Sequence, residues 1–106
     1  MVNMSRLLNK VAIVTGASKG IGGGIATALG AAGARGAVNY SSDREGAERV
    51  VQAITGNGGK AIAVGADVSR AADVARLFKE VDSAFGRLDI LVNNAGVFCF
   101  ARVAER

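Results

Sequence analysis

The segment Thr15–Gly22, with the sequence T-G-A-S-K-G-I-G, has the residue types of a turn that binds an anionic group. Glycines at positions 16, 20 and 22 let the backbone turn sharply and approach a ligand without a Cβ clash. N–H groups at the start of the predicted helix that follows, together with the positive end of its dipole, favour a pyrophosphate. Tight turns also use glycine for geometry alone, but the position after a strand and before a helix favours the binding interpretation.

A second polar segment, N-N-A-G at Asn93–Gly96, follows the last short apolar run of the chain. Alone, a turn rich in Asn and Gly is common after any strand. In a sheet of parallel strands, however, ligands bind in the crevice outside the carboxyl ends of the strands. We therefore expect Thr15–Gly22 and Asn93–Gly96 to lie together at that edge.

The elements that must position these two segments alternate between strands and helices. The predicted strands are Val11–Val14, Ala37–Tyr40, Ala61–Val64 and Ile90–Val92. Three helices are predicted between them, one over Gly20–Ala32, one after a Ser42–Glu45 capping box, and one after a cap at Ser69. The order β-α-β-α-β-α-β is typical of a parallel sheet with right-handed crossovers and helices on both faces.

Helical spacing of apolar residues predicts the buried face of each helix. The first helix is predicted to bury Ile21, Ile25, Leu29 and Ala32, the second Ala47, Val50, Val51 and Ile54, and the third Val74, Leu77, Phe78, Val81 and Phe85. Gly33 and Gly86 are predicted to end the first and third helices. Gly23, Gly24 and Gly36 are expected to weaken the elements that contain them.

Composition and charge narrow the class of protein. Half of the residues are hydrophobic, the net charge is +4, and no block of five like charges occurs, so a nucleic-acid partner is not favoured. No apolar stretch approaches the roughly 18 residues of a membrane span, and Met1–Lys10 has no apolar core of signal-peptide type. Cys99 stands alone and there is no His. We expect a soluble, cytoplasmic protein without a membrane partner and without His-based catalysis or metal binding.

The T-G-x-x-x-G-x-G turn and the N-N-A-G segment, in this order and on these elements, resemble the short-chain dehydrogenase/reductase family. Within it, the chain is most similar to the ketoacyl-carrier-protein-reductase and glucose-dehydrogenase-like members, over about Asn9 to Phe98. The resemblance implies a Rossmann-type doubly wound parallel sheet with strand order 3-2-1-4. It also implies a dinucleotide cofactor, bound by Gly16, Ser18, Lys19, Gly20, Ile21, Gly22, Tyr40, Ser41, Asp67, Val68, Asn93, Ala95 and Gly96.

The resemblance implies particular roles for some of these residues. Asp67 corresponds to the family Asp that contacts the adenine ring, although by itself it also suits a turn ahead of the Ser69 cap. Ala95 and Gly96 correspond to backbone positions beside the adenosine ribose. Asn93 corresponds to the Asn that ties the last strand of this half to Thr15.

The end of the second strand predicts which cofactor is preferred. An enzyme that uses NAD places an Asp or Glu there to bond the ribose 2′-OH, whereas this chain has Tyr40 followed by Ser41. Lys19 stands where NADP-preferring relatives have a basic residue, and Arg44 is a second cation that could reach a 2′-phosphate. Both are alternatively solvated surface charges. We expect NADP(H) to be preferred over NAD(H).

The family's catalytic Ser and its Y-x-x-x-K pair have no counterpart here, because Tyr40 is the only Tyr and Arg44 stands four residues after it. No catalytic residue is assigned. We expect residues 1–106 to be the dinucleotide-binding half of a Rossmann domain that lacks its catalytic half, and to be inactive alone. A parent enzyme would act on a small carbonyl or alcohol and form a homo-oligomer only with that half. The alternatives are a non-catalytic nucleotide-binding or interaction module and, far behind, a nucleic-acid binder.

Overall fold

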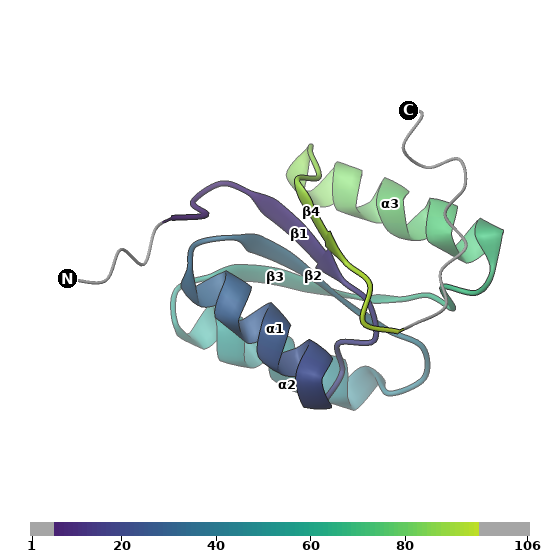
Figure 1. Ribbon diagram of the computed structural model, residues 1–106, viewed down its shortest axis with the longest axis horizontal. Helices are drawn as coiled ribbons and strands as arrows, with labels where there is room; N and C mark the ends of the chain where they lie inside the picture. The colour runs from purple at the N-terminus through teal and green to yellow at the C-terminus, as the bar shows by residue number, and fades with distance from the viewer. Residues whose placement is uncertain (1–5, 96–106) are drawn as a thin grey trace.

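The computed structural model describes residues 6–95 and is shown in Figure 1. Its elements, in chain order, are β1 (Val11–Val14), α1 (Gly20–Ala31), β2 (Arg35–Tyr40), α2 (Arg44–Gly56), β3 (Lys60–Gly65), α3 (Ala71–Phe85) and β4 (Ile90–Val92). The strands within this range pair in parallel in the order β3-β2-β1-β4. The predicted doubly wound sheet of Rossmann type, with strand order 3-2-1-4, is therefore confirmed.

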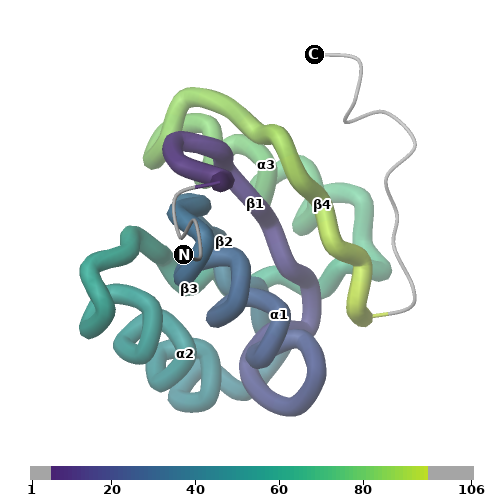
Figure 2. Tube along the Cα trace, turned by 60° about the vertical axis from the view of Figure 1, so that its left-hand side comes forward, coloured from purple at the N-terminus to yellow at the C-terminus, as the bar shows by residue number. Residues whose placement is uncertain are grey.

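The sheet separates two apolar clusters, because successive residues of a strand point to opposite faces. Figures 1 and 2 show α1 and α2 on one face and α3 on the other. The cluster under α3 contains Val11 and Ile13 of β1 together with Val74, Leu77, Phe78 and Val81. The cluster under α1 and α2 contains Val14, Ala26, Val38, Ala47 and Ile54. All of β1 is buried, as expected for a strand covered on both faces.

The buried face of α1 matches the predicted one in part, because Ile25 and Leu29 are partly buried and pack against the cluster under α1 and α2. Ile21 is 77% exposed, and the buried residues of this helix are Gly22, Gly23 and Ala26. The two glycines let the helix approach its neighbours closely, since a Cβ at Gly23 would lie 3.3 Å from Val50 Cγ2. Gly23 is thus closely packed against α2, while the expectation that it weakens α1 stays a prediction. At Gly24 and Gly36 a Cβ would meet nothing within 4 Å.

Two predicted helix caps are also wrong. The N-cap of α2 is Asp43, whose carboxylate accepts the Gly46 N–H at 3.0 Å, so Ser42 and Glu45 do not form the capping box. The N-cap of α3 is Arg70, which makes no side-chain cap, while Ser69 bonds to Asp67 instead. The predicted end of α3 is confirmed, with Gly86 in the left-handed conformation at φ 78°.

The strand predictions are confirmed with small shifts in their bounds. β1 and β4 coincide with the predicted runs, while β2 begins two residues earlier and β3 is one residue longer at each end. Among residues 6–95, no helix is long and apolar enough to cross a membrane.

Candidate functional site

The carboxyl edge of the sheet brings the two predicted segments together around Thr15. This residue follows β1 and is fully buried, and its hydroxyl accepts the N–H groups of Asn94 at 3.0 Å and Ala95 at 3.2 Å. The hydroxyl lies 3.3 Å from Asn93 Oδ1, to which it can donate its proton. The predicted tie between Asn93 and Thr15 is therefore present, and it joins the end of β4 to the end of β1.

The turn after β1 requires glycine at two positions for different reasons. Gly16 has φ 60°, and its carbonyl accepts the side-chain amide of Asn94 at 3.1 Å. A Cβ at Gly22 would lie 2.5 Å from both Gly16 O and Asn94 Nδ2. The first turn of α1 thus rests directly on the turn that precedes it, which brings its N–H groups to this edge.

The amino end of α1 is not capped by a side chain. Lys19 occupies the N-cap in an extended conformation and makes no side-chain cap, and the first turn of α1 contains no acidic residue. By contrast, α2 has the Asp43 carboxylate at its start and Glu45 in its first turn. An uncapped helix start beside a glycine turn is suited to an anionic ligand such as a pyrophosphate.

Asn39 joins three strands beneath this edge and was not predicted as a site residue. It is 2% exposed, its Oδ1 accepts the Gly16 N–H at 3.1 Å, and its Nδ2 donates to Val64 O at 3.2 Å and Ala66 O at 3.1 Å. The backbone carbonyl of Asn39 also accepts the Ala17 N–H at 2.8 Å. The available signal was an amide inside the otherwise apolar run that ends β2.

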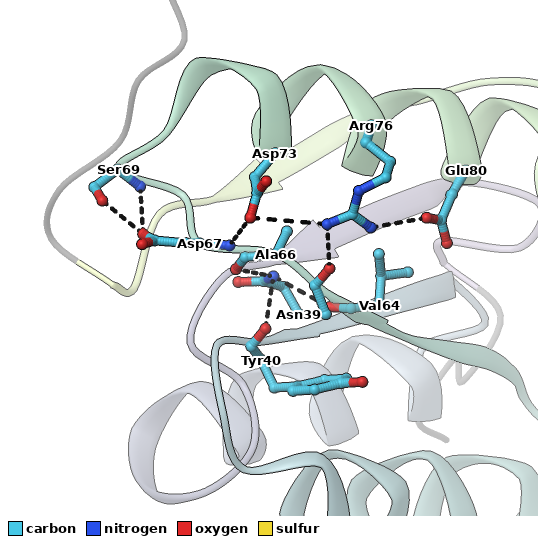
Figure 3. A network of polar contacts seen from close by, with 10 residues as sticks. Asn39, Tyr40, Val64, Ala66, Asp67, Ser69, Asp73, Arg76 and Glu80 are labelled. Atoms are coloured by element: carbon cyan, nitrogen blue, oxygen red, sulfur yellow. Dashed lines mark hydrogen bonds and ion pairs between the residues drawn. The ribbon is translucent and has the colours of Figure 1, made fainter.

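The loop after β3 presents the carboxylate of Asp67 at the same edge, bonded to Ser69 as Figure 3 shows. Asp67 Oδ1 accepts the Ser69 hydroxyl at 2.6 Å and the Ser69 N–H at 3.0 Å. These two hydrogen bonds lower the pKa of Asp67 below its usual range. The carboxylate is therefore charged at neutral pH and can accept a hydrogen bond from a ligand.

A cavity of about 180 Å³ lies between the turn after β1 and the loop after β3. Five predicted site residues line it together with three others: Gly16, Ser41, Asp67, Val68 and Ala95, with Asn39, Ala66 and Ser69. Ser18, Gly20 and Ile21 lie in and beside the turn at the start of α1. Gly96 is outside the described residues.

The two cations and the Tyr predicted at this site differ in their surroundings. Lys19 is exposed, and among residues 6–95 no ion pair involves it. Arg44 lies 3.1 Å from Glu48 in an exposed ion pair on α2. The ring of Tyr40 packs against Gly65, where a Cβ would lie 3.0 Å from the Tyr40 hydroxyl oxygen. Tyr40 is thus partly a packing residue. Separately, no cluster of His, Cys, Asp or Glu that could hold a metal ion occurs within residues 6–95.

Comparisons with known proteins agree with this architecture. A family model described as short chain dehydrogenase matches residues 10–106. Versicolorin reductase 1 of Aspergillus parasiticus is 48% identical over 105 residues, which are 99% of this chain and 40% of that protein. The 3-oxoacyl-[acyl-carrier-protein] reductase of a Synechocystis species is 49% identical over 94 residues, covering 89% of this chain and 38% of the relative.

Solved structures give the same result. A short chain dehydrogenase from Burkholderia cenocepacia, in complex with NADP, superposes with a TM-score of 0.82 at 48% identity. That match covers 89% of this chain and 38% of the other. The chain thus spans about two fifths of the length of the relatives that it matches. By its matched residues and its sheet topology, this chain belongs to the short-chain dehydrogenase family.

Proposed function

We propose that residues 1–106 are the dinucleotide-binding part of an oxidoreductase that transfers a hydride between NADP(H) and a small carbonyl or alcohol substrate. The observation that carries this proposal is the combination of an uncapped α1 start, a glycine turn and the cavity beside Asp67 at one edge of the sheet. When bound, the nicotinamide ring of the cofactor would give or accept the hydride. The residues present supply binding and orientation.

Each part of the edge suits one part of the cofactor. The pyrophosphate would lie at the start of α1, against the backbone of Gly16, Ser18 and the segment Gly20–Gly22. The adenine would enter the 180 Å³ cavity beside Asp67 and Val68. The adenosine ribose would lie near Ser41 and the backbone of Ala95. The glycine positions fit this assignment, since a side chain at position 22 would collide with the turn.

The proposed preference for NADP(H) depends on charge at the end of β2. Tyr40 and Ser41 place no carboxylate there, so nothing would repel a 2′-phosphate. Lys19 is exposed at the start of α1 and has no ion-pair partner within residues 6–95, which leaves it available to a phosphate. Arg44 supports the preference less, because it is paired with Glu48.

Titration of the 106-residue chain with NADPH and NADH tests both the binding and the preference. We expect the wild type to bind NADPH more tightly. Tyr40→Asp should lower the ratio of the NADPH affinity to the NADH affinity by about tenfold, because a carboxylate would repel the 2′-phosphate and bond the 2′-OH. Tyr40→Phe is the matched control, since it keeps the ring against Gly65 and adds no charge. Tighter binding of NADH by the wild type would contradict the preference, and a ratio that is the same in all three proteins would contradict its dependence on charge at position 40.

The main competing function is a nucleotide-binding or interaction module without turnover. The Y-x-x-x-K pair is absent from residues 1–106, so we assign hydride transfer only to a protein that also supplies these residues. Failure of the chain to bind either dinucleotide would overturn the proposed function. Binding of a dinucleotide would support the proposed cofactor site but would not identify the substrate.

A further inference from the structure

The segment that leaves β3 is fixed from below by β2. Asn39 Nδ2 donates to Val64 O at 3.2 Å and to Ala66 O at 3.1 Å, and the Ala66 N–H donates to Tyr40 O at 2.9 Å. Each of these bonds is made to the backbone, and Asn39 is buried. The path of the chain up to position 66 is therefore set by the sheet itself.

The same segment is held from above by two charged residues of α3, as Figure 3 shows. Asp73 Oδ2 accepts the Asp67 N–H at 2.8 Å, and Arg76 Nη2 donates to Gly65 O at 2.8 Å. The Arg76 guanidinium lies 3.8 Å from the Asp73 carboxylate. Asp73 and Arg76 thus hydrogen-bond to the backbone on either side of Ala66 and connect it to the first turns of α3.

These contacts determine how Asp67 meets the cavity. Ser69 occupies Oδ1 of Asp67, and Oδ2 makes no hydrogen bond with any other residue in the range 6–95. Oδ2 is therefore available to a ligand that donates an N–H. Rotation of the peptide at position 67 would move this oxygen, and the bond to Asp73 opposes that rotation.

We propose that Asp73 and Arg76 are positioning residues for recognition of the cofactor's adenine. They act through Asp67, by orienting its free carboxylate oxygen toward the 6-amino group of the base. This inference rests on the proposed function, since it requires adenine in the cavity beside Asp67. The competing explanation is purely structural, because an Asp in the first turn of a helix also stabilises the helix dipole.

The test compares NADPH with its hypoxanthine analogue, in which an oxygen replaces the adenine 6-amino group. We expect wild-type chain to bind NADPH about tenfold more tightly than the analogue, because the analogue cannot donate to Asp67. Asp73→Ala should reduce that ratio about fivefold. Asp73→Asn should keep it, because an amide oxygen still accepts the Asp67 N–H. A loss of stability alone would lower both affinities without changing their ratio.

Two further variants keep the proposal testable if Asp73→Ala does not fold. Arg76→Met removes the donor to Gly65 O and should lower the ratio in the same direction. Glu80→Ala is the matched control, because it removes the Arg76–Glu80 contact at 3.0 Å and touches nothing between Gly65 and Asp67. This control should keep the wild-type ratio.

The outcomes separate the two proposals. If wild-type chain binds neither dinucleotide, the proposed function fails. If it binds NADPH and discriminates against the analogue, but Asp73→Ala and Arg76→Met keep the wild-type ratio, the positioning role is overturned and the proposed function stands. Equal binding of NADPH and the analogue by the wild type would also overturn the positioning role, since there would be no discrimination to maintain.

Discussion

At the scale of single residues, the edge of the sheet is held by polar side chains that bond to backbone groups. Thr15 joins β1 to the segment after β4, and Asn39 joins the turn after β1 to the end of β3. Both side chains are buried and hydrogen-bonded, so replacing either with an apolar residue would leave backbone groups without partners. These residues would contribute to ligand binding indirectly, through the shape of the turn.

Asp89 has a comparable function at the start of β4. Its carboxylate accepts two N–H groups from Arg87, at 2.7 Å and 2.9 Å, and the Val11 N–H at 2.9 Å. The Asp89 N–H in turn donates to Val11 O at 2.9 Å. The hydrogen bonds from Arg87 lower the pKa of Asp89 below its usual range, and the hydrogen bond from Val11 makes the next largest contribution.

This lowered pKa predicts an acid-sensitive contribution to folding. Because the native state holds the proton more weakly than the unfolded state, the stabilisation is present above the unfolded pKa of 3.8 and is lost as the pH falls through the native value. We expect Asp89→Asn to be less stable than the wild type at pH 7, with the difference shrinking below about pH 4.

Urea midpoints at several pH values would measure this effect. Arg87→Gln removes the main cause of the lowered pKa and should give the same pH trend as Asp89→Asn. A stability difference that is constant from neutral to acidic pH would show that the Asp89 charge does not contribute.

At the scale of elements, the site depends on how closely α1 lies against the turn that precedes it. A Cβ at Gly22 would lie 2.5 Å from both the Gly16 carbonyl oxygen and the Asn94 side-chain amide. These two groups are hydrogen-bonded to each other, so neither can move away without breaking that bond. Gly24, two residues further along α1, has no such neighbour. The two glycines thus allow a matched comparison.

Gly22→Ala should destabilise the fold by about 1–3 kcal/mol, because the added methyl group must displace either the turn or the helix. Gly24→Ala should instead stabilise it by roughly 0.5–1 kcal/mol, since Ala is the better helix former and finds open space. Thermal unfolding measures both changes. NADPH titration should show weaker binding only for Gly22→Ala. Equal stability of the two variants would mean that α1 does not rest on the turn in solution.

The elements also show which features were predictable from sequence. The short apolar runs at Val11–Val14 and Ile90–Val92 were predicted with their bounds, because a continuous apolar run between turn residues is a strong local signal for a strand. The cap of α2 was not, although Ser42 and Glu45 have the spacing of a capping box. The Asp43 carboxylate caps the Gly46 N–H instead, and the two patterns could not be told apart from spacing alone, since Asp43 is also a good N-cap residue.

The candidate site was predictable to a similar degree. Its glycine turn and the Asn93 segment carry local signals, and the alternation of elements places them at one edge. The functions of Asn39, Asp73 and Arg76 were not predictable, because their partners lie on other elements and depend on how the strands and α3 pack. The exposure of Ile21 and the burial of Gly22 and Gly23 were likewise not predicted, because they depend on how closely α1 packs against the preceding turn and α2.

At the scale of the whole molecule, β4 is the edge strand least protected against pairing with another chain. Within residues 6–95 it pairs only with β1, and its three residues Ile90, Leu91 and Val92 are each partly exposed. Leu91 packs toward α3 and Val92 toward α1, so the strand is apolar on both faces. An apolar edge strand without Pro or Lys to protect it is a site for pairing with another chain.

We therefore predict that the 106-residue polypeptide associates, or is poorly soluble, through the edge of β4 that faces away from β1. Ile90→Lys is the variant that tests this, because Ile90 belongs to neither apolar cluster and a Lys on an edge strand opposes pairing. Size-exclusion chromatography with light scattering over a concentration series should show larger species for the wild type and more monomer for Ile90→Lys. Association that is unchanged in Ile90→Lys would place the contact elsewhere. A sharp monomer peak of the wild type with cooperative melting would instead show that residues 1–106 form a self-sufficient domain, and would favour the stand-alone binding module.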